Sequence, residues 1–334
     1  MEQSEWDGAR PRCQELPTTP RPEIGTVLVT GATGYIGARL VPELLARGYR
    51  VRLMVRRESP EERQRWPTAE IAVADALDPT ALAEALRGIH TAYYLIHSLR
   101  LGKGEFESAD IRAAVNFRKA AEVNGVDRII YLGGLGDVST DLSAHLKSRM
   151  RVAEELDRGE VKTTIIRAAM IIGSGSISYE IVKHLVIRLP LLFVPRWART
   201  ECQPISIRDV VKYLIGVLET PVSSGRTFDI GGGKILRYDE ILQILAQLMG
   251  KKRLFLPSPV SSVAVYAYVA GLVSPVPASI IRCLMEGCRN RVVCNNNDIH
   301  KIIPMDLIPF EDALLRALSH EQQDDPSTRW WVVG

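Results

Sequence analysis

The chain contains 334 residues, enough for one large α/β unit or for such a unit with a smaller lobe. Hydrophobic residues make up 46% and charged residues 24%, as in ordinary globular proteins, and a formal net charge of +3 with scattered arginines excludes a strongly basic nucleic-acid-binding surface. Five cysteines, an odd number in so long a chain, exclude a disulfide framework and favour a reducing, cytoplasmic setting.

The two ends of the chain are expected to be tails. Residues 1–23 are polar and rich in proline and lack the apolar core of a signal peptide, so the sequence predicts a disordered N-terminal tail. Residues 321–334 are expected to form a C-terminal tail.

Two apolar stretches need a separate interpretation. Neither approaches the roughly 18 uninterrupted apolar residues of a membrane-spanning helix. Residues 185–194 are interrupted by Arg188 and Pro190, whereas residues 260–273 are predicted to form a buried helix. Contact with a membrane surface through either stretch is left open.

Residues 26–37, TVLVTGATGYIG, read as a short strand, a glycine turn and the start of a helix. Three glycines, each three residues from the next, let the backbone turn tightly, approach a diphosphate closely and pack the helix on the strand. The free N–H groups of the helix N-terminus then face the anion. The predicted nucleotide-binding residues of this segment are Gly31, Thr33, Gly34, Tyr35, Ile36 and Gly37.

A helix is predicted at 38–47 and the second strand at 51–55, which is followed directly by Arg56 and Arg57. In a site that prefers NAD(H), an acidic residue near this strand end binds the ribose 2′-hydroxyl. Here no carboxylate occurs before Glu58. A pair of cations favours a 2′-phosphate, and therefore NADP(H) over NAD(H), although two solvated loop charges are the alternative interpretation.

The third and fourth strands are expected at 71–74 and 91–96. The third ends at Asp75, which can accept a hydrogen bond from an adenine amino group or serve as a structural residue before the helix at 79–86. The fourth ends at His97 and Ser98. Because these strand ends face the ligand crevice of an open α/β sheet, we expect His97 to contact the dinucleotide, with hydrogen bonding within the protein as the alternative.

Helices at 106–123 and 141–156 alternate with strands at 128–132 and 163–168. This rhythm predicts right-handed βαβ crossovers and a doubly wound parallel Rossmann sheet over residues 24–170.

Beyond residue 170 the rhythm loosens, and residues 171–320 are interpreted as a substrate-side lobe interleaved with the last sheet strands. A further strand is expected at 228–230 and an amphipathic helix at 238–249. Leu191, Phe193 and Trp197 would suit a site for an apolar or isoprenoid substrate, or they are core residues. Gln203 and Arg208 could line the crevice, although Arg208 could equally form a structural ion pair with Asp209. The spacing of Cys283, Cys288 and Cys294 matches no zinc pattern, so no metal is expected.

Several stretches, taken in order, resemble the atypical and extended short-chain dehydrogenase/reductase superfamily. Within it they are similar to a bacterial NAD(P)-binding subgroup that is often joined to a DUF2867 domain and is distantly related to NmrA-like regulators and the 39-kDa accessory subunit of respiratory complex I. The resemblance covers roughly residues 25–320 and implies a Rossmann fold, a nicotinamide dinucleotide and oxidoreductase activity; a full DUF2867-like domain is not expected. The stretches are VLVTGATGYIG, Asp75, YYLIHS, IIYLGGLG, HLKSR, IIGSGS, QPISIRDV and SPVPASI.

The chain departs from this superfamily where the resemblance implies catalysis. Active members have a Tyr-x-x-x-Lys pair on the helix after the fifth strand and a Ser or Thr at that strand end. By position, these residues fall on His145, Arg149 and either Gly133 or Gly134. The i, i+4 spacing keeps both side chains on one helix face. Arg149 can still bind ribose hydroxyls, but it disfavours the imidazolium of His145, which makes this histidine a poor acid at neutral pH.

Two functions therefore follow as hypotheses. The first is an NADPH-dependent oxidoreductase acting on a small or apolar carbonyl, enone or quinone-type substrate, with His145 or water as proton donor and His97, Ser98, Ser139 and Tyr179 as candidate helpers. The second is a non-catalytic NADP(H)-binding redox sensor, or an assembly or stabilising factor of a respiratory complex. An epimerase or isomerase with bound NAD ranks last because the tyrosine is missing. No nucleic-acid partner is expected, and the substrate is not identified.

Overall fold

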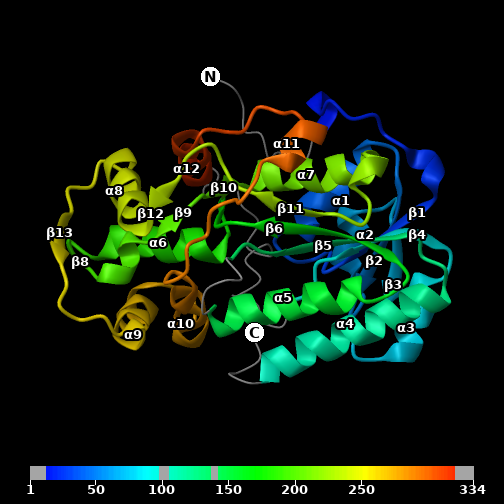
Figure 1. The fold of residues 1–334 in the computed structure, drawn as a ribbon, viewed down its shortest axis with the longest axis horizontal. Helices are drawn as coiled ribbons and strands as arrows, with labels where there is room; N and C mark the ends of the chain where they lie inside the picture. The colour runs from blue at the N-terminus through cyan, green and yellow to red at the C-terminus, as the bar shows by residue number, and fades with distance from the viewer. Residues whose placement is uncertain (1–12, 98–104, 137–141, 320–334) are drawn as a thin grey trace.

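The computed structural model describes residues 13–97, 105–136 and 142–319. Within these residues, seven strands form a parallel sheet in the order β11-β6-β5-β4-β1-β2-β3 (Figure 1). The order runs outwards in both directions from β1 and β4, as in a doubly wound Rossmann-like sheet. The strands are β1 (Thr26–Thr30), β2 (Arg50–Val55), β3 (Glu70–Val73), β4 (Ile89–Tyr94), β5 (Arg128–Gly134), β6 (Lys162–Ala168) and β11 (Thr227–Ile230).

Helices cover both faces of this sheet (Figure 1). The alternation of side chains along β1 explains why: Val27 and Val29 join one apolar cluster, and Leu28 between them joins the other. The first cluster includes α1 (Gly37–Ala46) and α7 (Ile207–Glu219), and the second includes α3 (Pro79–Leu86), α4 (Glu105–Val123) and α5 (Ala144–Asp157). A short helix, α2 (Pro60–Arg65), lies between β2 and β3.

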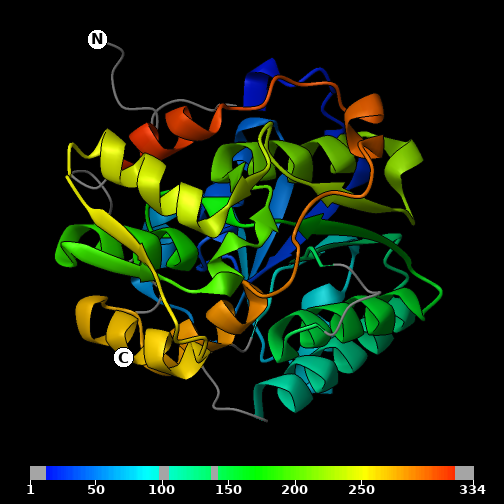
Figure 2. The same ribbon diagram turned by 60° about the vertical axis from the view of Figure 1, so that its left-hand side comes forward.

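Apart from α11, which packs against β11, the remaining elements gather beyond the carboxyl ends of β5 and β6, towards the left of Figure 1. In Figure 2, α8 lies beside α12 and α9 beside α10. The short strands pair as β7 with β10, β9 with β12, and β8 with β13. The strands are β7 (Ile171–Ile172), β8 (Leu191–Val194), β9 (Glu201–Cys202), β10 (Ile205–Ser206), β12 (Leu236–Arg237) and β13 (Leu254–Pro257); the helices are α6 (Ile177–Arg188), α8 (Tyr238–Leu248), α9 (Val263–Val273), α10 (Ala278–Gly287), α11 (Asp298–Ile302) and α12 (Phe310–Ser319).

The fold class predicted from the sequence is confirmed, and so is the expected strand at 228–230, which is β11 and pairs with β6. The limits of several elements differ from the prediction by one to three residues, two of them most clearly. The strand expected at 91–96 begins earlier, at Ile89, and ends at Tyr94. The helix expected to begin at 141 begins at Ala144, because the hydroxyl of Ser143 accepts a hydrogen bond from the N–H of Leu146 at 3.3 Å and caps it. The division at residue 170 stays a prediction.

The disordered tail predicted over residues 1–23 is wrong for its second half. Cys13 begins a 3₁₀ turn and is 2% exposed, and its N–H donates to Glu43 of α1 at 2.9 Å. Arg47 forms a buried ion pair with Glu219 of α7 at 2.6 Å and donates to the carbonyl of Thr18 at 2.8 Å. These long-range contacts hold a polar, proline-rich segment that local composition alone predicts to be disordered. Residues 1–12 and 321–334 and the candidates Ser98 and Ser139 lie outside the described residues.

The buried helix predicted at 260–273 is also wrong in part. It begins at Val263, and one side of it packs through Val263, Ala267 and Ala270 against α6 and α10. Its other side faces outwards, with Tyr268 64% and Leu272 70% exposed. Among the described residues, no helix combines the length and apolar character needed to span a membrane.

Candidate functional site

The glycine turn between β1 and α1 has the close backbone packing that its sequence predicts. Gly31 has φ +60, a conformation that favours glycine, and its carbonyl accepts a hydrogen bond from Gly34 at 2.9 Å. A Cβ at Gly37 would lie 2.3 Å from the carbonyl oxygen of Gly31 and 2.7 Å from the Cα of Ala32. The third glycine therefore lets α1 begin directly against the turn, which directs the helix N-terminus towards the carboxyl edge of the sheet.

The turn is joined to the segment that leads from β7 into α6. Arg39 of α1 lies over the ring of Tyr35 at 4.1 Å and donates to the carbonyls of Tyr35 at 3.0 Å and Ser174 at 3.1 Å. Tyr35 and Ile36 line a large cavity that extends into the lobe, whereas Thr33 is exposed. The predicted glycine set thus lies between the sheet and the cavity.

Arg56 and Arg57 are exposed at the carboxyl end of β2, which pairs with β1. Neither forms an ion pair with any residue that the structure describes. Asp75, after β3, accepts a hydrogen bond from the N–H of Leu77 at 2.8 Å, so its structural role is present. Its second predicted role, as acceptor for an adenine amino group, stays a prediction.

Two of the predicted site residues meet a third residue that the sequence did not single out. The Nδ1 atom of His97, after β4, lies 3.0 Å from Oδ2 of Asp110 on α4. The Nε2 atom of His97 lies 3.1 Å from Nε2 of His145, in the first turn of α5. Asp110 is 2% exposed. The three side chains form a continuous chain of hydrogen-bonding groups that ends at the cavity, which both histidines line.

Both histidines favour the neutral form. Burial lowers the pKa of His145 well below 6.5, and the neighbouring charges of His97 and Arg149 lower it further. Burial also lowers the pKa of His97, opposed by the hydrogen bond from its ring to the carboxylate of Asp110. The destabilisation of the His145 imidazolium that the sequence predicted from Arg149 is therefore present, but burial is the larger cause.

Arg149 lies one turn after His145, and its guanidinium donates to the carbonyl of Leu132 and, at 3.3 Å, to that of Ile96. It also lies 4.8 Å from the ring centre of Tyr131. Arg149 thus joins the ends of β4 and β5 while lining the cavity. Binding of ribose hydroxyls by this residue stays a prediction.

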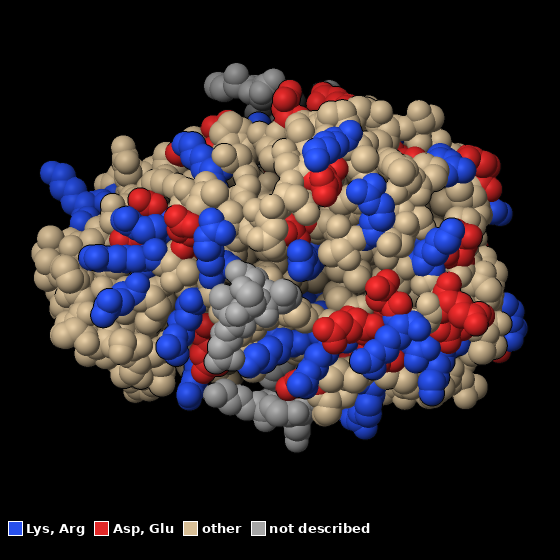
Figure 3. Space-filling model, viewed as in Figure 1, with Lys and Arg blue, Asp and Glu red and all other residues tan. Residues whose placement is uncertain are grey.

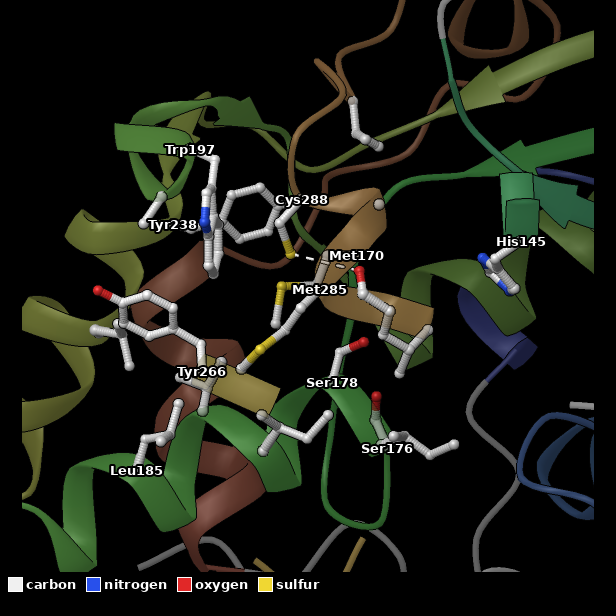
Figure 4. A pocket seen from close by; sticks show the side chains of 18 of the residues that line it. His145, Met170, Ser176, Ser178, Leu185, Trp197, Tyr238, Tyr266, Met285 and Cys288 are labelled. Atoms are coloured by element: carbon white, nitrogen blue, oxygen red, sulfur yellow. Dashed lines mark hydrogen bonds between the residues drawn. The ribbon is translucent and has the colours of Figure 1, made fainter. Parts of the chain in front are cut away.

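The cavity has a volume of about 940 Å³ and extends from the strand ends into the lobe. Figure 4 shows His145 at one end and Trp197 and Tyr266 at the other. Within the described part of the chain, Arg149 is the only Lys, Arg, Asp or Glu in its wall. Leu191, Phe193 and Trp197 line it, as the interpretation of an apolar substrate site expected. Gly133 and Gly134 line it where the superfamily has Ser or Thr.

Three other candidates lie elsewhere. Tyr179 is fully buried in the apolar cluster around α8 and α12 and does not line the cavity, so its interpretation as a core residue holds. Gln203 binds the carbonyl of Gly232 at 2.7 Å and the N–H of Cys294 at 3.0 Å, and so joins two loops. Arg208 is buried and also lies away from the cavity wall.

Sequence reasoning missed Asp110 and Tyr238, and it weighed Cys288 only as a possible metal ligand and not as a wall residue of the cavity. Asp110 lies inside a long helix, and only the fold shows that it faces His97. Tyr238 and Cys288 line the cavity wall in the lobe (Figure 4). Burial raises the pKa of the Cys288 thiol to about 12, so it is not a thiolate at neutral pH. No motif or spacing in the sequence signals any of the three.

Comparison with known proteins agrees with this geometry. Residues 31–186 match the family model described as NAD(P)H-binding. The chain is 27% identical over 252 residues to the chloroplastic divinyl chlorophyllide a 8-vinyl-reductase of Zea mays, covering 70% of this chain and 62% of the maize protein. It is 28% identical over 242 residues to the ceramide reductase of Caulobacter vibrioides, covering 70% of this chain and 74% of that protein.

Among solved structures, the triphenylmethane reductase of a Citrobacter species, complexed with NADP(H), matches with a TM-score of 0.68 at 18% identity. The match covers 87% of this chain and 99% of that one, and at this identity it concerns the fold. The chain spans less than two thirds of the length of the maize reductase. Taken together, the sheet and the glycine turn form a Rossmann-like α/β fold, part of which matches the NAD(P)H-binding family model, and the chain is similar to reductases of the atypical short-chain dehydrogenase/reductase type.

Proposed function

We propose that the protein is an NADPH-dependent reductase of an uncharged, apolar carbonyl, enone or quinone-type substrate. The observation that carries the proposal is the series Asp110, His97 and His145, which ends at an almost wholly apolar cavity beside the predicted nicotinamide end of the dinucleotide site. Proton transfer needs a donor within hydrogen-bonding reach of the substrate, and His145 is the polar side chain placed for it.

The dinucleotide fits the carboxyl edge of the sheet. The close backbone packing at Gly31 and Gly37, where a Cβ would clash with neighbouring backbone atoms, sets the N-terminus of α1 against the turn, and this N-terminus supplies N–H groups for the diphosphate. Arg56 and Arg57 support the preference for NADP(H), because both are exposed where a ribose 2′-phosphate is expected. When bound, the reduced nicotinamide supplies a hydride, and the protein must supply the matching proton.

The three-residue series supplies this proton without a charged His145. In the reactive form, His97 is an imidazolium that donates Nδ1–H to Asp110 and Nε2–H to Nε2 of His145. Neutral His145 then carries its own proton on Nδ1. It gives that proton to the substrate and receives another on Nε2 from His97, which becomes neutral. The lowered pKa of His145 is compatible with this role, because His145 is neutral before and after the step.

The lining of the cavity supports the substrate class. Because Arg149 is the only charged side chain among the described wall residues, a charged substrate would lose its hydration without gaining a partner in the lobe. Apolar walls formed by Leu185, Leu191, Phe193 and Met285 suit a long or polycyclic hydrocarbon body, with its reducible group near His145.

The test is oxidation of NADPH by the purified full chain in the presence of apolar quinones, enones and aldehydes. We expect turnover of at least one class, and loss of turnover with unchanged NADPH binding in His145→Ala. His300→Ala, on α11 and away from the cavity, is the matched control and is expected to keep full activity. Equal turnover by His145→Ala and the wild type would contradict the proposal that His145 transfers the proton.

A second candidate function, non-catalytic binding of NADP(H) by a sensor or assembly factor, is favoured by Arg149. Its guanidinium donates hydrogen bonds to the carbonyls of Leu132 and Ile96, so it has a structural role besides the predicted contact with a ribose. Tight NADPH binding with no turnover across all three substrate classes would support this second function over the first.

A further inference from the structure

The lobe carries an exposed apolar surface around α9, β8 and β13, here called the portal surface. An apolar helix in a globular protein is normally buried, but α9 contains no charged residue and still leaves one side uncovered. Contiguous exposed apolar surface of this kind marks an interaction site. The portal surface comprises the exposed residues Phe193, Leu254, Leu256, Val260, Val265, Tyr268, Val269 and Leu272.

The portal surface is continuous with the cavity. Phe193, Val260, Val265 and Val269 are exposed on the outside and also line the cavity wall. A path without a charged side chain thus leads from the surface of the lobe into the cavity. An opening for a water-soluble substrate gains nothing from such a rim, whereas an apolar molecule can pass along it without entering water.

The segments that build the portal surface contain exposed cations and no carboxylates. The sequence contains no Asp or Glu from Ile181 to Thr200 or from Ile241 to Met285. In the same segments, Arg188, Arg196, Lys251 and Lys252 are exposed. In Figure 3 the surface over α9, at the lower left, shows neither blue nor red, and Lys and Arg side chains lie above it with some Asp and Glu side chains among them.

Aromatic side chains lie at the same rim. Trp197 and Tyr266 pack edge to face, with ring centres 5.4 Å apart, and both line the cavity. The indole N–H of Trp197 donates to the carbonyl of Ser261 at 3.1 Å. Trp and Tyr are the residues that favour the boundary between lipid headgroups and acyl chains, because one end of each is apolar and the other polar.

We propose that the protein docks on an anionic lipid bilayer through the portal surface, so that its substrate enters the cavity from the membrane. Apolar side chains of α9, β8 and β13 enter the interface, and Arg188, Arg196, Lys251 and Lys252 contact the anionic headgroups. Docking requires neither bound dinucleotide nor reduction of a substrate, so the docking proposal can be correct even if the proposed reaction is not. Entry of the substrate from the bilayer rests on the proposed function.

A second copy of the chain is the main alternative occupant. Two-fold pairing through the portal surface would bring the cations of one copy close to the same cations of the other, with no carboxylate in these segments to compensate them. An anionic lipid surface compensates the same charges. The charge pattern therefore favours the bilayer.

The experiment is flotation of the full chain with vesicles of phosphatidylcholine and phosphatidylglycerol, compared with vesicles of phosphatidylcholine alone. We expect binding to the anionic vesicles, weakening as salt screens the cations. Leu272→Glu is expected to reduce the partition coefficient at least about tenfold, because it places a charge in the apolar interface. The matched control is Val123→Glu at the end of α4, a residue that is 83% exposed and lies outside the portal surface.

The electrostatic part is tested separately. Lys252→Glu is expected to weaken binding to the anionic vesicles at least about fivefold, since it removes one cation and adds an anion. Lys119→Glu, exposed on α4, is the control and is expected to bind as the wild type does. A thermal melt of each variant shows whether the fold is kept, independently of NADPH binding and turnover.

Three results would overturn the proposal: wild-type protein that does not float with anionic vesicles, control variants that lose binding as much as the portal variants, and a dimer in solution that Leu272→Glu dissociates. The last result, measured by light scattering, would assign the portal surface to a second copy. Turnover of NADPH without any vesicle binding would leave the reductase function standing and remove the docking alone.

Discussion

The two parts of the molecule use apolar residues differently. In the sheet, the apolar residues of β1 are fully buried between helices, as Val27, Leu28 and Val29 show. In the lobe, α9 and β13 have as apolar a sequence but leave Tyr268, Leu272 and Leu254 exposed around a large cavity. The sheet buries such residues between its helices, whereas the lobe leaves apolar surface around the cavity that we propose for the substrate. Each prediction below changes residues in one part, or where the two parts meet, and gives the effect expected on cofactor binding, activity or stability.

The largest effect is expected from Gly37→Val on the sheet side. A Cβ at this position would lie 2.3 Å from the Gly31 carbonyl oxygen, and backbone atoms cannot move aside as a flexible side chain can. We expect loss of measurable NADPH binding together with a lower melting temperature. Gly233→Ala is the control: a Cβ there meets no atom within 4 Å, so both properties should be kept. An unchanged dinucleotide affinity in Gly37→Val would contradict the predicted role of the turn.

The second effect concerns His145 and Asp110, which lie where the sheet meets the cavity of the lobe. His145→Ala removes the proposed proton donor and is expected to lower kcat by about 100-fold or more, with little change in NADPH binding. Asp110→Asn keeps the shape but removes the negative charge beside His97, so a smaller loss of kcat is expected. Stopped-flow measurement of NADPH oxidation distinguishes the two variants. A normal kcat with a raised KM would indicate that His145 only shapes the cavity.

The third effect is on cofactor choice. Replacing Arg56 and Arg57 together by Ala is expected to weaken NADPH about tenfold or more and to leave NADH almost unchanged, because only NADPH carries the 2′-phosphate. Fluorescence titration of both nucleotides measures the ratio. Arg63→Ala, which removes an exposed arginine of α2, serves as the control. A proportional loss of both affinities would contradict a specific contact with the 2′-phosphate.

The smallest effect is a pH dependence with opposite signs for activity and stability. The relay needs protonated His97, whose pKa burial lowers below 6.5, so kcat/KM should rise as the pH falls towards and through that lowered value. Stability should fall over the same window, below about pH 6.5, because unfolded histidines bind protons that the folded ones do not. Steady-state assays and melting curves across pH test both signs. In Asp110→Asn the activity profile should move to lower pH, since the carboxylate raises the pKa of His97; activity independent of pH would contradict the relay.

Local patterns predicted the strands and helices of the sheet well, because the residues that define each of these elements lie close together in the sequence. Alternating strands and helices, the three glycines and the cations after β2 each lie within a few residues of one another. The failures were of the opposite kind. Residues 13–23 looked disordered because their partners, Glu43 and Glu219, are far away in the chain, and α9 looked buried because exposure depends on what packs against it.

The sequence by itself determined the βαβ order, the glycine turn, the presence of His145 and Arg149 where the superfamily has Tyr-x-x-x-Lys, and the absence of Asp and Glu from residues 181–200 and 241–285. The tertiary structure alone decided that Asp110 and His97 lie behind His145, that Arg149 joins two strand ends, and that α9 opens onto an apolar cavity. The physical reason is the distance along the sequence between the residues that interact. Hydrogen-bonding turns and helix periodicity depend on adjacent residues, whereas a proton relay and a cavity wall form only where distant elements meet.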